Sequence, residues 1–268
     1  MADLKERLDI LLVDKGFFAS REKAKASIMA GLIYVDGAIS DKPGTKIDLE
    51  SEIVIKEDLC PYVSRGGLKL EKAMELWGFG LDGKVCMDMG ASTGGFTDCM
   101  LQHGAARVYA VDVGYGQLDW KLRNDPRVVN MEKTNIRYLD TALICEPVDF
   151  ISIDVSFISL DLMFPVAAKV LADDGQIVAL VKPQFEAGRE QVGKKGIVRD
   201  LDVRKEVLRN VAGYAAKAGF SAAGLSFSPV TGAKGNVEFL LYLTKKFVNI
   251  NIERKIDDIV FDSHRELE

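Results

Sequence analysis

Long apolar runs are missing from this sequence. No stretch approaches 18 consecutive apolar residues, which argues against a transmembrane helix. The first segment, MADLKERLDILL, carries charges among its apolar residues, so we expect no secretory signal peptide. With 48% hydrophobic and 28% charged residues, the chain has the composition of a globular protein. These features predict a cytoplasmic protein with no membrane partner.

Cysteine and histidine are scarce as well. The four cysteines, Cys60, Cys86, Cys99 and Cys145, show no C-x-x-C spacing, and two histidines are too few to complete a usual zinc site. We therefore expect free thiols in a reducing compartment and no bound metal.

An excess of positive charge is also absent, since the formal net charge is −5. Net charge describes solubility and association, whereas one face of a protein can still be basic. A nucleic-acid partner would therefore depend on local clusters of Lys and Arg. At 268 residues the chain has room for two unequal domains.

Residues 1–58 form a small unit in the sequence pattern. Apolar residues at helical spacing predict helices over 4–15 and 20–30. The Asp36-Gly37 pair lies between apolar runs and predicts a hairpin in a small, turn-rich β element. Residues 59–65, which include a proline, are expected to form a linker.

From residue 66 onward, short apolar runs alternate with helical patterns, which is typical of a parallel α/β sheet. The expected strands are 84–88, 107–112, 127–130, 149–154, 176–182, 221–228 and 237–244. The expected helices are 66–78, 95–103, 115–124, 136–144, 159–172, 200–218 and 250–266. Because the last two strands are joined by a short connection, they predict an antiparallel pair at the sheet edge. We expect a Rossmann-like, mostly parallel sheet over 66–246, and a C-terminal helix or tail over 247–268.

A glycine-rich turn follows the first strand of this sheet. Asp88 ends that strand, and Gly90-Ala91-Ser92-Thr93-Gly94-Gly95-Phe96 opens a helix. Glycines let a ligand approach the backbone, and a helix N-terminus offers unpaired N–H groups. Asp112 ends the next strand, 24 positions after Asp88, where an acid can accept hydrogen bonds from ribose hydroxyls. The alternative is a turn that serves packing only.

The spacing of this turn narrows the choice of ligand. Its glycines run G-x-x-x-G-G rather than the G-x-G-x-x-G of nicotinamide enzymes, and no Walker lysine follows them. Together with the antiparallel edge pair, the turn favours a methyltransferase that binds the adenosine-containing donor S-adenosylmethionine.

Four charged residues are placed where the cleft of such a sheet would be. Asp154 and Lys182 end the fourth and fifth strands, Glu238 begins the last strand, and Lys69 lies on the helix before the sheet. A ribose hydroxyl is a poor nucleophile, so an amine that accepts its proton would help methyl transfer. The alternative for Lys182 is a surface lysine paired with Asp154.

Two features of base methyltransferases are missing. No N-P-P-Y-like tetrapeptide follows the fourth strand, where Asp154-Val155-Ser156-Phe157 stands instead. No cysteine is placed to attack a pyrimidine ring. Both absences favour a hydroxyl acceptor.

Several long motifs occur in one order along the whole chain. They are Arg7-Leu8-Asp9 with Ser20-Arg21, Ser64 to Leu70 (SRGGLKL), Asp88 to Asp98 (DMGASTGGFTD), Asp154 to Ser159 (DVSFIS), Lys182 to Glu186 (KPQFE) and Gly235 to Phe239 (GNVEF). In these motifs the chain closely resembles the TlyA family, proteins often labelled hemolysin A. The resemblance implies an S4 RNA-binding domain followed by an FtsJ-like 2′-O-methyltransferase domain. It also implies methylation of cytidine in the RNA of ribosomal subunits or their precursors.

The resemblance implies a catalytic tetrad of Lys69, Asp154, Lys182 and Glu238. The residues expected to bind the cofactor are Ser64, Arg65, Gly66, Asp88, Gly90, Ser92, Thr93, Gly94, Gly95, Phe96, Asp112, Asn135 and Asp154.

By analogy with S4 domains, the first two helices present basic residues to RNA phosphates. A basic, glycine-containing segment, 183–199, follows Lys182 and is expected to be a mobile loop that closes over RNA. The residues expected to contact RNA are Arg7, Lys15, Arg21, Lys23, Lys25, Arg189, Lys194, Lys195 and Arg199. The alternatives are a solvated, salt-bridged helix face and a plain surface loop.

Two other classes of function remain open. A membrane-active hemolysin would need an insertion segment, and only the charged helix 250–266 could serve. A non-catalytic RNA-binding protein would keep the fold without the chemistry, although the four charged residues of the tetrad favour an enzyme.

Overall fold

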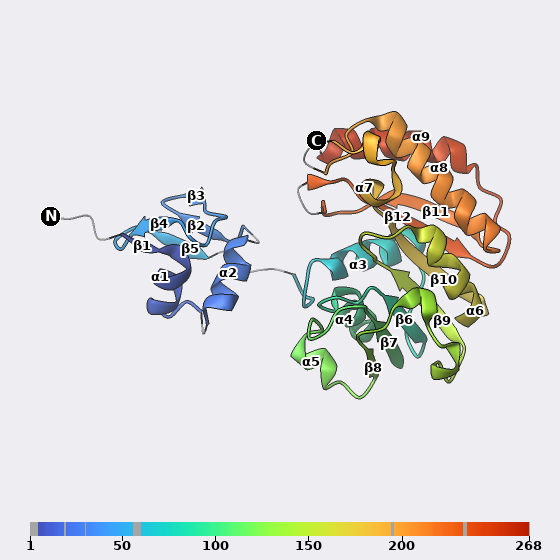
Figure 1. The fold of residues 1–268 in the computed structure, drawn as a ribbon, viewed down its shortest axis with the longest axis horizontal. Helices are drawn as coiled ribbons and strands as arrows, with labels where there is room; N and C mark the ends of the chain where they lie inside the picture. The colour runs from blue at the N-terminus through green and yellow to red at the C-terminus, as the bar shows by residue number, and fades with distance from the viewer. Residues whose placement is uncertain are drawn as a thin grey trace. The chain divides into compact units, whose positions relative to one another are not determined.

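The chain divides into two compact units, Met1–Leu59 and Cys60–Glu268. The computed structural model describes residues 5–18, 20–29, 31–55, 60–193, 196–232 and 235–267, with only the backbone of residues 23 and 26. Figure 1 shows the helices and strands of each unit. Each unit has a hydrophobic core of its own.

The C-terminal unit is built on a seven-stranded sheet with the order β11-β12-β10-β9-β6-β7-β8. Its strands are β6 (Val85–Met89), β7 (Arg107–Val111), β8 (Val128–Met131), β9 (Val148–Ile153), β10 (Leu171–Val181), β11 (Ser221–Phe227) and β12 (Phe239–Thr244). The strands from β6 to β10 are parallel, while β12 lies antiparallel between β10 and β11. The expectation of a mostly parallel sheet with an antiparallel edge pair is confirmed.

The two faces of this sheet bury two separate clusters, because successive side chains of a strand point to opposite faces. In β9, Phe150 lies in one cluster, and Ile151 and Ile153 lie in the other. The central strands are buried on both faces, which explains their continuous apolar sequence.

Helices cover both faces. The first cluster is shared with α3 (Gly66–Trp77), α4 (Gly95–Gln102) and α5 (Trp120–Arg123), and the second with α6 (Phe164–Val170), α8 (Leu201–Lys217) and α9 (Ile252–Leu267). Figure 1 shows α8 and α9 beside each other over β11. Since Ile256 and Val260 are fully buried, α9 is part of the C-terminal unit.

The N-terminal unit packs two helices, α1 (Leu8–Asp14) and α2 (Arg21–Met29), against short strands. These are β1 (Lys5–Arg7), β2 (Ile33–Val35), β3 (Ala38–Ile39), β4 (Lys46–Asp48) and β5 (Ile53–Ile55). The hairpin expected at Asp36-Gly37 joins β2 to β3, and both residues have positive φ, as a tight hairpin turn requires.

Four expected helices differ from the structure. In place of the helix expected over 159–172, a 3₁₀ turn, η3 (Leu160–Leu162), precedes α6, and β10 already begins at Leu171. The helix expected over 4–15 does not begin at residue 4, because residues 5–7 pair with β4 as a strand. Of the helix expected over 115–124, only α5 forms. In place of the helix expected over 136–144, two 3₁₀ turns form, η1 (Ile136–Tyr138) and η2 (Thr141–Leu143), each capped by a side chain that accepts a backbone N–H.

Candidate functional site

Strand direction brings the four charged residues of the expected tetrad to one edge of the sheet. Asp154 and Lys182 follow the carboxyl ends of the parallel strands β9 and β10. Because β12 is antiparallel to β10, with Phe239 opposite Val181, the start of β12 places Glu238 at the same edge. Lys69 reaches this edge from the first turn of α3.

The four side chains form a chain of ion pairs in a buried place. Lys182 Nζ lies 2.5 Å from Asp154 Oδ1, and Lys69 Nζ lies 3.8 Å from Asp154 Oδ2. Lys69 Nζ also donates to Glu238 Oε2 over 2.7 Å. The two lysines are each 9% exposed and Glu238 is 3% exposed. Such burial is unusual for lysine. The ion pair with Asp154 that the alternative for Lys182 expects is present, but the amine is buried and does not lie at the surface.

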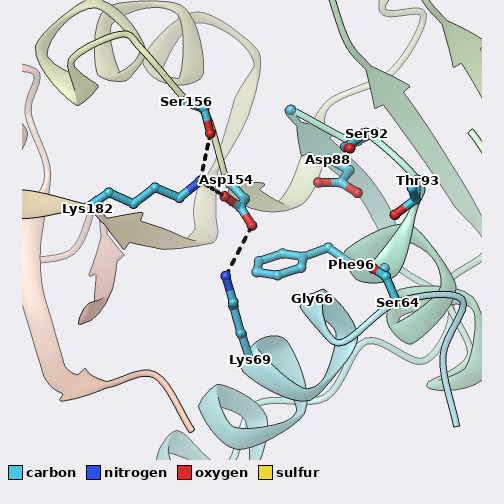
Figure 2. Close-up of a pocket in the computed structure, with 13 residues that line it drawn as sticks. Ser64, Gly66, Lys69, Asp88, Ser92, Thr93, Phe96, Asp154, Ser156 and Lys182 are labelled. Atoms are coloured by element: carbon cyan, nitrogen blue, oxygen red, sulfur yellow. Dashed lines mark hydrogen bonds and ion pairs between the residues drawn. The ribbon is translucent and has the colours of Figure 1, made fainter. Parts of the chain in front are cut away.

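Lys182 has a second partner that the sequence did not single out. Its Nζ donates to Ser156 Oγ over 3.1 Å, and Figure 2 shows the ammonium group between Ser156 and Asp154. Ser156 lies two residues beyond Asp154 in the loop that follows β9. The two contacts fix the position of the amine at the cavity wall, where Asp154, Ser156 and Lys182 all lie.

The glycine turn wraps around this edge of the sheet. Gly90 has φ +93°, and a Cβ there would collide with the backbone carbonyl of Asp154. A Cβ at Gly95 would collide with Ser64 Oγ. Glycine at these two positions therefore lets three segments of the chain come together around one cavity.

Asp88 fastens the glycine turn to the sheet. Its Oδ2 accepts hydrogen bonds from the Thr97 backbone N–H (3.0 Å) and hydroxyl (2.7 Å), and its Oδ1 accepts one from Ser152 Oγ (2.9 Å). Burial raises the pKa of Asp88 to about 6, although these hydrogen bonds act in the opposite direction.

Asp112 lies at the end of the neighbouring strand and shapes a second cavity. Its two carboxylate oxygens accept hydrogen bonds from the backbone N–H groups of Ser92 (2.8 Å) and Gly114 (2.6 Å). The turn after β6 and the turn after β7 are thereby tied together. Asn135 lines the same cavity, with its side-chain oxygen accepting from the Arg137 N–H.

The two cavities are neighbours and have volumes of about 240 and 460 Å³. Both are lined by Gly90, Ser92, Asp154 and Ser156. Cavities of this size suit a nucleoside-sized ligand. The second cavity offers a carboxylate for ribose hydroxyls, and the first offers the glycine turn and the buried lysines. The residues present therefore fit S-adenosylmethionine.

Most residues expected at the cofactor site line these cavities, but two do not. Arg65 is exposed and precedes α3. Gly94 has φ +96° and faces Leu118 and Leu122, so it serves packing. Conversely, the cavities are also lined by Ser156, Gln117 and Phe157, which sequence reasoning missed. Phe157 is 90% exposed and has φ +64°. Neither its exposure nor its backbone conformation could be predicted from the neighbouring residues.

The residues expected to contact RNA differ in their partners and in their exposure. Arg7 and Arg21 share one partner, Asp9. Lys15 Nζ donates to the Leu49 carbonyl. Lys25 is half-buried, whereas Arg189 and Arg199 are exposed. The Lys23 side chain, Lys194 and Lys195 lie outside the described residues.

Part of the segment 183–199 is firmly anchored. Its first residues form α7 (Pro183–Glu186), where Glu186 accepts from Ser159 Oγ and the Leu160 N–H. Near its end, Val198 is buried, and its carbonyl accepts two hydrogen bonds from the fully buried Arg204. The two ends of this segment are thus held by hydrogen bonds, part-buried at Glu186 and buried at Val198, so movement of the expected loop would be confined to the residues between them.

The part of the chain that the structure describes lacks two features. No helix there is long and apolar enough to cross a lipid bilayer. Among the same residues, no group of three His, Cys, Asp or Glu side chains is placed to hold a metal ion.

Comparison with known proteins connects this geometry to a family. Residues 62–245 match the FtsJ-like methyltransferase family, and residues 6–53 match the S4 domain. The chain is 54% identical to a Bacillus subtilis protein that carries the provisional name rRNA methyltransferase YqxC, over 91% of this chain and 87% of that protein. It is 44% identical to the 16S/23S rRNA (cytidine-2′-O)-methyltransferase TlyA of Mycobacterium tuberculosis, over 88% and 89%.

A solved structure shares both units. It is a protein from Streptococcus thermophilus, provisionally named a hemolysin, with 50% identity and a TM-score of 0.79, over 99% of this chain and 98% of that one. The resemblance drawn from the sequence motifs is confirmed. The chain belongs to the FtsJ-like methyltransferases, in the TlyA group that joins this domain to an S4 domain, and its methyl donor is S-adenosylmethionine.

Proposed function

We propose that this protein methylates the 2′-hydroxyl of a cytidine in ribosomal RNA, acting on ribosomal subunits in the cytoplasm. The observation that carries the proposal is the buried amine of Lys182, held between Asp154 and Ser156 at the wall of the cofactor cavity. The names of the relatives support the choice of RNA and nucleotide.

The four charged residues have distinct roles in this proposal. Lys182 receives the proton that the 2′-hydroxyl loses, which a lysine can do in its neutral form. Asp154 and Ser156 orient this amine, and Lys69 with Glu238 fixes the other oxygen of Asp154. S-adenosylmethionine supplies an electrophilic methyl group. Holding both reactants in one cavity orients them for reaction and so lowers the entropic part of the activation barrier.

Binding of the cofactor is assigned to the residues that line the two cavities. The glycine turn accommodates the donor, Asp88 fastens that turn to the sheet through Thr97, and Asp112 is available to the ribose hydroxyls. Phe157, an exposed aromatic ring on the cavity wall, offers a face on which a base can stack. We assign RNA binding to residues 1–58, together with Arg189 and Arg199, and methyl transfer to residues 66–246.

The proposal is tested by methylation of purified small and large ribosomal subunits with cofactor labelled in its methyl group. A 2′-O-methyl group blocks alkaline cleavage of the next phosphodiester, because the hydroxyl that would attack it is gone. We expect the label in alkali-resistant dinucleotides that begin with cytidine. Label released in mononucleotides, or on the base, would contradict the proposal.

A further inference from the structure

The N-terminal unit contains a fully buried carboxylate. Asp9 lies in the first turn of α1, and its side chain is 0% exposed. Its Oδ1 accepts from Arg7 Nε over 3.0 Å, and its Oδ2 accepts from Arg7 Nη2 over 3.2 Å. Arg21 Nη2 donates to the same Oδ2 over 2.8 Å. A buried charge needs such partners, because desolvation without them is costly.

These contacts hold the carboxylate in its charged form. Hydrogen bonds from Arg7 lower the pKa of Asp9 to about 2, against the effect of burial, and Arg21 adds to this lowering. Arg7 presents Nε and Nη2 to the two oxygens together, which is the two-pronged geometry that only arginine can make. The guanidinium groups are therefore fixed in direction as well as in place.

Both arginines can be reached by another anion from solvent. Their side chains are 44% and 47% exposed, and Arg7 Nη1 takes no part in the contacts with Asp9. Gly44 leaves room beside this nitrogen, since a Cβ at Gly44 would lie 3.3 Å from it. Because both Nη2 atoms donate to one oxygen, the two guanidinium groups meet at Asp9. Two positive charges held this close together suit a single phosphate group.

We infer that Asp9 is a positioning residue that makes Arg7 and Arg21 one clamp for a phosphodiester of the RNA backbone. The inference rests on the proposed function, because it takes RNA as the partner of the N-terminal unit. Arginines that are already immobilised lose less conformational freedom when they bind. For each side chain, this smaller entropy loss raises affinity roughly threefold to tenfold.

The clamp and a simple charge effect predict opposite results for Asp9→Asn. This change removes one negative charge close to the RNA, so electrostatic attraction alone would strengthen binding. A positioning role predicts weaker binding, because an amide has one accepting oxygen in place of two and no charge, so Arg7 loses its two-pronged contact. Glu22→Gln is the matched control: it removes the same charge from an exposed side chain of α2.

The experiment measures binding of the full chain to purified, deproteinised ribosomal RNA over a series of salt concentrations. For Asp9→Asn we expect affinity to fall about threefold to tenfold, with a shallower salt dependence. For Glu22→Gln we expect unchanged or tighter binding. Tighter binding by Asp9→Asn, at unchanged thermal unfolding, would overturn the inference.

A second variant keeps the test valid if Asp9→Asn does not fold. Arg7→Lys preserves the charge but cannot span both oxygens of Asp9. We expect it to lose nearly as much affinity as Arg7→Ala, whereas affinity equal to that of the unchanged protein would refute the clamp. Methylation by the unchanged protein is measured beside these variants. If it places no methyl group on ribose, the proposed function fails, whereas normal methylation with unaffected variants rejects only the clamp.

Discussion

Replacing Lys182 with methionine is the most direct test of the proposed chemistry. Methionine has a similar length and an apolar tip, so it fills the same space without an amine. In the structure this amine contacts Asp154 Oδ1 at 2.5 Å and Ser156 Oγ at 3.1 Å. Lys182→Met therefore removes the proposed proton acceptor, while the glycine turn and Asp112, which line the two cavities, are left in place.

The contacts of Asp154 set the expected size of the effects. A positioned acid or base contributes about 10²- to 10⁴-fold to rate, so we expect kcat to fall by that factor. Loss of one partner from a buried ion pair costs about 3–5 kcal/mol. Asp154 is 20% exposed and keeps Lys69 at 3.8 Å, so we expect a smaller loss of about 1–3 kcal/mol in the free energy of unfolding.

The assay combines the methylation rate on ribosomal subunits with calorimetric measurement of cofactor binding. We expect the Kd for S-adenosylmethionine to change only a few-fold. Lys182→Arg keeps a positive charge but cannot give up its proton, so it separates charge from proton transfer. Lys255→Met changes an exposed lysine of α9 and is the matched control. If Lys182→Arg retains more than about a tenth of kcat, the loss is smaller than the about 10²- to 10⁴-fold that a positioned base contributes, and the proposed role is refuted.

Three further changes test the geometry of the site. Glu238→Gln removes the close partner of Lys69, so we expect kcat to fall at least about tenfold and the melting temperature to drop, while an unaltered rate would separate Glu238 from catalysis. Gly90→Ala forces a Cβ against the Asp154 carbonyl at positive φ, so calorimetry should show cofactor affinity reduced by at least about tenfold. Gly80→Ala, in open space, should bind normally. Asp88 has a raised pKa of about 6, so the folded protein binds more protons than the unfolded chain between about pH 4 and 6, and its stability falls as pH rises through this window. From about pH 4 to 6, the free energy of unfolding of the unchanged protein should fall by about 3 kcal/mol relative to that of Asp88→Asn. Urea titrations at several pH values measure this difference, and an equal pH dependence of the two proteins would contradict the raised pKa of Asp88.

The sheet was predictable from sequence because its signals are local. Buried parallel strands read as short apolar runs, and the glycine turn after Asp88 needs its glycines for close approach. The placement of Glu238 could also be anticipated, since the short connection between the last two strands indicated an antiparallel pair.

Contacts between distant parts of the chain were beyond sequence reasoning. Residues 115–119 do not join α5, because Glu132 accepts hydrogen bonds from the backbone N–H groups of Gln117 and Leu118. The apolar pattern of residues 115–119 gives no sign that Glu132, which follows β8, will bind their backbone. In the same way, Lys5–Arg7 form a strand because β4 lies beside them, and the partner of both Arg7 and Arg21 is visible only once the unit has folded.

The ion-pair chain at the sheet edge joins two lysines to two carboxylates. A side chain that is to accept a proton must start neutral, so in the proposed mechanism Lys182 leaves the set with one negative charge. A sulfonium donor would balance that charge. Once the methyl group has left the donor and the proton has moved to Lys182, the four side chains balance one another and the donor is a neutral thioether. The spent donor would therefore lack the ionic attraction that held the fresh one, which favours its exchange.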